Sequence, residues 1–257
     1  LWLATPDDGL CAMLYSDSTI SAQVAGGQTV VIREKTRYPF SDTIELEFSA
    51  RTNAAFPLYL RVPGWCEAPQ LLLNGRPIKV AAKPGKYIRI EREWKTGDLV
   101  ELKLPMKIST RTWTRNESCV SVDRGPLTYS LKIEERYLAS AGSETIRQSK
   151  NESAKANFKD WPAYEIFPAS PWNYGLVLED GFQCIERPWP DTDMPWTHAG
   201  APVLLTALAK LIPGWKLQEN NLIGKTPPSP VKTDESLARV TLLPMGACRL
   251  RLSAFPA

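Results

Sequence analysis

The sequence has one histidine, no long apolar run and no block of like charges, and each shortage argues against a class of function. His198 would have to serve any Ser-His-Asp or Cys-His arrangement, yet no nucleophile motif flanks it, so we interpret it as a surface-loop residue. No stretch approaches the roughly 18 apolar residues of a membrane span. The 31 basic and 28 acidic residues are interspersed, which leaves no basic track for a phosphate backbone or an anionic bilayer. We therefore expect neither nucleic acid nor a membrane as a partner.

Paired cysteine motifs and phosphate-binding loops are also missing. The five cysteines lie more than fifty residues apart, which offers no ready chelate for a metal: Cys11, Cys66, Cys119, Cys184 and Cys248. Their odd number argues against a complete disulfide framework, although one long-range bridge stays open. Gly26-Gly27 is followed by no helix and no Lys-Ser/Thr pair. We expect mostly buried, reduced thiols, no metal site and no cofactor in this chain, and the compartment stays undecided.

Short segments that alternate apolar and polar residues dominate what is present. Thr43–Phe48 alternates as a half-buried strand requires, and Asn74-Gly75 is typical of a type I′ hairpin turn. Further strands are predicted at 10–15, 29–34, 58–62, 71–73, 87–91, 99–104, 119–122, 127–131, 238–243 and 249–252. A composition with 43% hydrophobic residues can fill such cores. The sequence predicts an all-β protein made of two tandem antiparallel β-sandwich modules.

A change of pattern after Pro105 places the boundary between these modules. Polar residues fill 109–112, so we assign residues 1–106 to a first module and 107–257 to a second. The polar stretch 134–160 suggests an exposed insertion or a surface helix, and 185–200 and 213–235 are predicted to be loops. The chain begins without Met or a charged-then-apolar leader, which suggests a start within a longer protein.

Large aromatic residues gather in the loop-rich part of the second module. Exposed indole and phenol rings stack on sugar faces, so five residues form a candidate carbohydrate-binding set: Trp161, Trp172, Tyr174, Trp189 and Trp196. All four of these tryptophans adjoin prolines, and the alternative interpretation is that they pin long loops onto the module or against a neighbouring domain. The sequence leaves both interpretations open.

Carboxylates supply no catalytic pair that a motif supports. Glycoside hydrolysis needs one carboxyl in an apolar setting and a second that stays ionised. The loop residues Glu186, Asp191 and Asp193 would be the candidates, whereas carboxylates such as Glu45 fit the outward face of a strand. We therefore predict no catalytic residue in this chain.

Several motifs occur in the order and spacing of a known family. They are Leu60–Trp65, Leu73–Pro77, Lys83–Tyr87, Trp94–Asp98, Arg124–Leu127, Pro171–Gly175 and Leu242–Arg251. Together they resemble the C-terminal part of glycoside hydrolase family 127, the β-L-arabinofuranosidases and their relatives. The resemblance spans nearly the whole chain, and its motifs lie in both modules, between residue 60 and residue 251.

The resemblance implies a larger enzyme. In that family an N-terminal (α/α)₆ barrel holds a zinc through one Glu and three Cys, one of which is the nucleophile, and two β-sandwich modules follow. None of the cysteines of this chain matches the barrel motif, so zinc would belong to the barrel. The parent would be a retaining exo-glycosidase that removes terminal sugars such as L-arabinofuranose, and this chain alone would be inactive.

The resemblance also suggests partners and two functions. The partners would be the barrel of the same protein, a second copy through a sandwich module, and a plant-type polysaccharide or oligosaccharide. As a scaffold, the chain should expose a contiguous apolar patch that the barrel covers. As a carbohydrate-binding module, it should present coplanar, exposed indoles, whereas indoles packed into loops would argue against that function.

Overall fold

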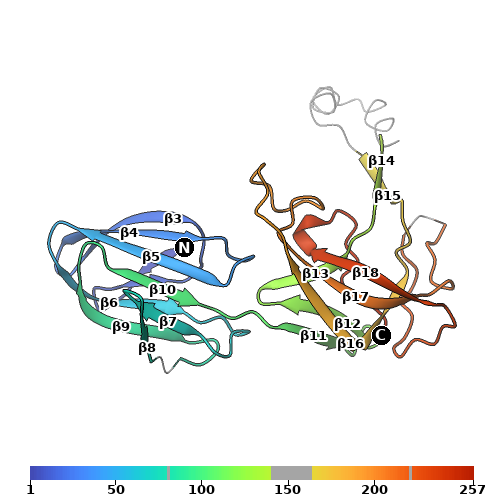
Figure 1. Cartoon of the computed structure of the whole chain (residues 1–257), viewed down its shortest axis with the longest axis horizontal. Coiled ribbons are helices and arrows are strands. Elements are labelled where there is room, and N and C mark those ends of the chain that lie inside the picture. Colours follow the sequence, from blue (N-terminus) through green and yellow to red (C-terminus); the bar gives the residue numbers. More distant parts are fainter. Residues whose placement is uncertain (80–81, 140–163, 220–221) are drawn as a thin grey trace, which may run out of the picture. The chain divides into compact units, whose positions relative to one another are not determined.

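The computed structural model describes residues 1–79, 82–139, 164–219 and 222–257, and within them the protein is built of strands (Figure 1). The described residues contain one helical segment, the short 3₁₀ helix η1 (Met245–Ala247), and no helix long and apolar enough to cross a membrane. The predicted all-β class with tandem antiparallel β modules is confirmed.

The chain divides into two compact units. The first comprises Leu1–Ile108 and the short turn Arg124–Pro126, and the second comprises Ser109–Asp123 and Leu127–Ala257. The first unit is therefore discontinuous in sequence, because residues 124–126 belong to the first unit although the residues before and after them in sequence belong to the second.

The first unit is a sandwich of two sheets. The four-stranded sheet has the order β1 (Trp2–Ala4), β2 (Leu10–Ala12), β6 (Ala54–Arg61) and β9 (Tyr87–Trp94). The six-stranded sheet has the order β3 (Ser18–Val24), β4 (Gln28–Thr36), β5 (Thr43–Ala50), β10 (Leu99–Lys103), β7 (Gln70–Leu73) and β8 (Arg76–Ile78). The pairing is antiparallel, except that β2 runs parallel to β6.

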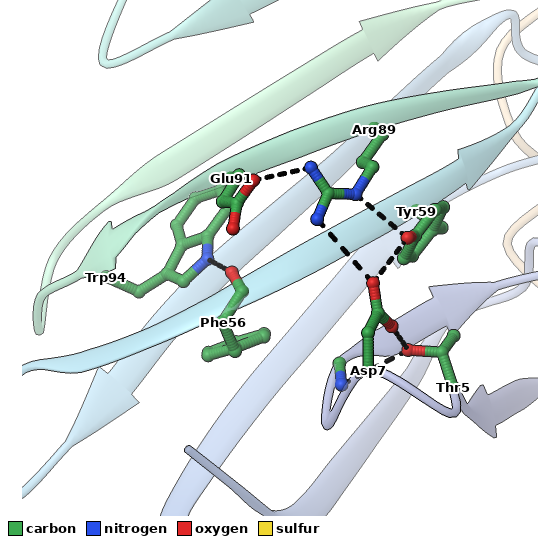
Figure 2. A network of polar contacts seen from close by, with 8 residues as sticks. Thr5, Asp7, Phe56, Tyr59, Arg89, Glu91 and Trp94 are labelled. Atoms are coloured by element: carbon green, nitrogen blue, oxygen red, sulfur yellow. Dashed lines mark hydrogen bonds and ion pairs between the residues drawn. The ribbon is translucent and has the colours of Figure 1, made fainter.

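Period-2 alternation explains how these sheets enclose a core. In β5, Ile44, Leu46 and Phe48 are buried while the residues between them reach the outer face, as the sequence predicted. Phe48 stacks on Trp94 of β9, in the other sheet, with ring centroids 4.2 Å apart. The Trp94 Nε1 donates a hydrogen bond to the Phe56 carbonyl at 2.9 Å (Figure 2), so this buried indole has no unsatisfied donor.

A polar network covers the outer face of the four-stranded sheet (Figure 2). Tyr59 donates to Asp7 at 2.6 Å, and Arg89 Nε donates to the Tyr59 hydroxyl oxygen at 2.9 Å. Arg89 also lies 3.6 Å from Asp7 and 2.5 Å from Glu91. Hydrogen bonds from Thr5 and Tyr59 lower the pKa of Asp7. The network fastens the segment between β1 and β2 to β6 and β9.

The predicted Asn74-Gly75 hairpin is confirmed. Both residues have positive φ, 51° and 74°, and the flanking β7 and β8 pair with Leu73 opposite Arg76. Asparagine and glycine tolerate this left-handed backbone better than other residues, which fixes a tight turn here.

The second unit contains a six-stranded and a two-stranded sheet. The larger has the order β11 (Ile108–Trp113), β12 (Cys119–Arg124), β13 (Leu127–Leu131), β18 (Leu237–Pro244), β17 (Val203–Leu211) and β16 (Tyr174–Glu186). The smaller pairs β14 (Glu135–Ala139) with β15 (Tyr164–Pro168). A loop of residues 187–202 joins β16 to β17.

One strand expected in this unit is absent, and two segments hold strands that were not among those predicted. The polar stretch at 109–112 is an edge strand, β11, and an edge strand exposed to solvent needs no apolar alternation. The stretch from 134 begins with β14, and its residues 140–160 lie outside the described residues. The strand predicted at 249–252 is absent, because the amides of Arg249 and Leu250 bind a carboxylate instead of a neighbouring strand.

Candidate functional site

The aromatic residues singled out in the sequence lie at several places in the second unit. Trp172 is half-buried and meets Trp215 edge to face, with ring centroids 5.1 Å apart at 69°. Trp172 also lines an apolar hollow of about 430 Å³, together with residues such as Phe167 and Ile223. Tyr174 is half-buried at the start of β16, opposite Leu211 of β17. Trp161 lies outside the described residues.

Trp189 and Trp196 belong to the loop between β16 and β17. The Trp189 Nε1 donates to Asp193 Oδ1 at 2.7 Å, and the Asp193 amide donates to the Pro190 carbonyl at 2.9 Å. Asp193 therefore closes a turn of the loop. Glu186 and Asp191 are exposed, as Asp193 is, so the described structure gives none of these carboxylates the apolar setting that a general acid needs.

Trp196 lies against the backbone of η1. A Cβ atom placed on Gly246 would come within 2.6 Å of Trp196 Cε3 and 2.9 Å of Cζ3. Only glycine at this position leaves room for the indole. Trp196 is 38% exposed, so one part of the ring packs against Gly246 while another part faces solvent.

Beside Trp196 is a polar hollow of about 350 Å³, whose lining includes Glu134, Glu135, Tyr137, Trp196, His198 and Arg249. Three segments contribute: β14, the loop before β17 and the residues after η1. We call it the Glu135 hollow. Its position depends on contacts between residues more than one hundred positions apart, such as Glu135 and Arg249.

Glu135 is the best-fixed carboxylate of this hollow. Its Oε1 accepts hydrogen bonds from the backbone amides of Arg249 and Leu250, at 2.8 and 3.2 Å, and its Oε2 accepts one from the Tyr137 hydroxyl at 2.6 Å. Burial raises the pKa of this carboxyl, but the bonds from Tyr137 and the two amides outweigh burial and hold the pKa below its ordinary value. Glu135 is thus ionised at neutral pH.

His198 lies on a loop, as predicted, but its ring is mostly covered. The side chain is 21% exposed, and its Nε2 is 3.6 Å from Glu135 Oε1. That distance is too long for a hydrogen bond. Within the part of the chain that the structure describes, the buried Nε2 has no hydrogen-bond partner.

The cysteines are free thiols in the structure, and four of the five are buried, with Cys184 exposed. Burial, with a smaller contribution from the Glu135 charge, raises the pKa of Cys248 to about 11, so this thiol is a poor nucleophile. Across residues 1–79, 82–139, 164–219 and 222–257, no three His, Cys, Asp or Glu side chains converge as metal ligands would. These residues do not fit the Glu and three Cys that zinc would need.

The sequence missed most of the Glu135 hollow. Trp196 was singled out because it is an aromatic loop residue, but Glu135 and Tyr137 carry no local signal, and Arg249 was noted only as part of the motif Leu242–Arg251 and of a predicted strand. Two features of the sequence could have pointed to this hollow. One is the single histidine, and the other is Gly246, which has no side chain and so leaves room for the indole of Trp196.

Comparisons with known proteins place the chain. Residues 9–106 match the family model of the GH127 β-L-arabinofuranosidase middle domain. The chain superimposes on a GH127 β-L-arabinofuranosidase from Geobacillus stearothermophilus T6 with a TM-score of 0.63 and 22% identity, covering 98% of this chain and 33% of that enzyme. A search of curated proteins found no match.

Two further solved structures agree. A glycoside hydrolase aligns with a TM-score of 0.60 and 21% identity over 97% of this chain and 36% of its own. A GH127 β-arabinofuranosidase aligns with a TM-score of 0.64 and 18% identity over 98% and 35%. The chain thus spans about a third of the length of these enzymes.

Fold and comparisons define the chain first as a non-barrel β region of the kind found in glycoside hydrolases. More particularly, its residues 9–106 match the middle-domain model of the GH127 β-L-arabinofuranosidase family, and the β unit that follows shares its fold with the matching part of those enzymes.

Proposed function

We propose that this chain is the non-catalytic scaffold of a larger GH127 glycosidase, whose own zinc-bearing (α/α)₆ barrel hydrolyses terminal glycosidic bonds. The middle-domain match and the coverage of only a third of each solved relative support this proposal. The scaffold would bury apolar surface against the barrel and keep it folded. A homodimer through one of the β units stays a prediction.

The observation that carries the scaffold role is a cluster of exposed leucines in the first unit. Leu1, Leu3 and Leu14 are 59%, 45% and 51% exposed. The Leu1 carbonyl accepts hydrogen bonds from the amides of Met13 and Leu14, at 3.0 and 3.3 Å, which brings Leu14 beside Leu1. Leu1 and Leu3 are two positions apart on extended backbone and so point to the same side. Gathered exposed apolar side chains mark an interaction surface.

The test compares this chain with the longer protein that includes the barrel, on an aryl β-L-arabinofuranoside. We expect turnover by the longer protein and none by this chain, with or without zinc. In the longer protein, the double substitution Leu3→Glu and Leu14→Glu should cut kcat/KM at least about tenfold and lower Tm, because charges would be buried against the barrel. In this chain alone, the same substitutions should change stability by less than about 0.5 kcal/mol.

The matched control is Leu237→Glu, since Leu237 is 55% exposed on β18 of the second unit. It should leave the activity and Tm of the longer protein unchanged. Turnover by this chain alone would overturn the non-catalytic assignment. Full activity and unchanged Tm in the Leu3/Leu14 double variant would overturn the scaffold surface.

The alternative, a carbohydrate-binding module with Trp161, Trp172, Tyr174, Trp189 and Trp196 as one stacking platform, stays a prediction. Among the four that the structure describes, Trp172 packs on Trp215 and Trp189 bonds to Asp193. Trp196 has the Glu135 hollow beside it and is the one that a specific observation favours.

A further inference from the structure

We propose that the Glu135 hollow of the second unit binds one neutral sugar residue, stacked on Trp196 and hydrogen-bonded by Glu135 and His198. This site does not depend on the scaffold role, because all its residues lie within the second unit.

The indole of Trp196 is a preorganised platform. Gly246 supports it from the η1 side, and the turn that follows it is fixed as well. The amide of Gly200 donates to Thr197 Oγ1 at 2.9 Å, and the amide of Ala201 donates to the Thr197 carbonyl at 3.0 Å. A Cβ on Gly200 would lie 2.2 Å from the Met194 carbonyl oxygen, so this turn also requires glycine. An aromatic ring held in place before a ligand arrives costs little ordering entropy on binding.

The carboxylate of Glu135 keeps one acceptor position available. An ionised carboxylate offers about four lone-pair sites, and the amides of Arg249 and Leu250 and the Tyr137 hydroxyl use three. The side chain is only 10% exposed, so a hydroxyl bound there would be shielded from water. The remaining site is on Oε2, because Oε1 already accepts two bonds, and a sugar hydroxyl can donate to it.

His198 supplies a second hydrogen-bonding group for the same sugar hydroxyl. Its buried Nε2 lacks a hydrogen-bond partner within the described residues, which costs free energy unless a ligand or solvent atom satisfies it. The 3.6 Å between Nε2 and Glu135 Oε1 is too long for a direct bond but puts the imidazole beside the carboxylate, so that one hydroxyl oxygen can reach both Nε2 and the open position of Oε2. A hydroxyl both donates and accepts, so it can donate to the carboxylate and accept from the imidazole N–H.

Charge and size select the ligand class. Glu134 and Glu135 both line the hollow, and their negative charges disfavour carboxylate or phosphate ligands, while Arg249 disfavours cations. A hollow of about 350 Å³ beside one exposed indole suits a single sugar ring. A neutral polyhydroxylated ring is the chemistry that matches these features.

His198 makes the test direct, because it is the chain's one histidine and its imidazole C–H signals in NMR report on this hollow alone. The complete 257-residue chain would be titrated with L-arabinose, D-xylose and D-galactose, with glycerol as an acyclic polyol. We expect a saturable shift of the His198 signals with at least one sugar and none with glycerol at equal concentration. Trp196→Ala should weaken the apparent affinity at least about tenfold, and Trp196→Phe less, since it keeps an aromatic face.

The matched control is Met194→Ala, an exposed side chain on the same loop but outside the lining of this hollow, which should keep the wild-type affinity. Absence of a saturable shift with all three sugars would overturn the site, as would glycerol acting like the sugars or equal weakening by Trp196→Ala and Met194→Ala. If Trp196→Ala fails to fold, an unchanged affinity in Trp196→Phe and in Tyr137→Phe together overturns it. None of these results bears on the barrel assay, so the two proposals can fail separately.

Discussion

At the residue scale, Asp98 shows how one buried carboxylate ties together several strands of the first unit. Its Oδ1 accepts from Asn74 Nδ2 at 2.8 Å, and its Oδ2 accepts from the Lys95 amide at 2.9 Å and pairs with Arg92 at 3.2 Å. Burial raises the pKa of Asp98, but the bonds from Asn74 and Lys95 and the Arg92 charge lower it further, leaving it below its ordinary value.

We expect Asp98→Asn to lower the free energy of unfolding at pH 7 by about 2 kcal/mol, because it weakens charge-assisted hydrogen bonds in a buried site. The folded pKa lies below the unfolded value of about 3.9, so this stabilisation is complete above that pH and disappears as pH falls through the folded pKa. Urea unfolding at pH 7 and pH 2.5 measures it, and the gap between wild type and variant should narrow in acid. An equal gap at both pH values would contradict an ionic origin.

Glu91→Gln is the control for that experiment. Glu91 pairs with Arg89 on the outer face, and both side chains are well exposed, at 66% and 45%. Exposed pairs contribute little to stability, so this variant should unfold like the wild type at both pH values.

At the element scale, the sequence predicted the strands whose two faces differ and missed those whose faces do not. β5 alternates buried and exposed positions and was found, whereas β11 is exposed along most of its length and was not among the predicted strands. β14 was missed for the same reason, since its described side chains beyond Glu135 are exposed. Alternation is a signal of partial burial, and an edge strand or a two-stranded ribbon does not produce it.

The parallel pairing of β2 with β6 depends on a close approach that local pattern could not reveal. A Cβ on Gly9, just before β2, would lie 2.3 Å from the Pro57 carbonyl oxygen of β6. We expect Gly9→Ala to force these strands apart and lower the free energy of unfolding by about 1–3 kcal/mol. Urea denaturation followed by tryptophan fluorescence measures the loss.

Gly64→Ala is its control, because a Cβ on Gly64 would meet nothing within 4 Å and φ there is not in the left-handed region. It should change the unfolding free energy by no more than about 0.5 kcal/mol. If both variants were equally stable, the close approach of Gly9 to Pro57 would not be needed for the parallel pairing of β2 with β6.

At the scale of the whole molecule, the features that the sequence could not predict are those that join distant segments. The two-module fold and the family resemblance followed from alternation, turns and motifs along the chain. The Glu135 hollow did not, because Glu135 and Arg249 are 114 positions apart and neither is unusual in its local sequence. The assignment of Arg124–Pro126 to the first unit is another such feature, since the strands on either side belong to the second.

That turn provides a last prediction, because Gly125 meets two separate constraints. Its φ is +56°, and a Cβ there would lie 2.6 Å from Met106 Cγ. Gly125→Ala should therefore lose about 1–2 kcal/mol for the left-handed backbone and a further 1–3 kcal/mol for overpacking. Gly85→Ala, with φ of +75° and nothing within 4 Å, should lose only the first amount. When Met106 is already alanine, the overpacking is relieved, so Gly125→Ala should then lower the free energy of unfolding only as much as Gly85→Ala lowers it in the wild type. Urea unfolding of Gly125→Ala, Gly85→Ala, Met106→Ala and the Gly125/Met106 double variant measures this. Equal losses in Gly125→Ala and Gly85→Ala would mean that Met106 moves aside freely and that this turn is not packed tightly in the first unit.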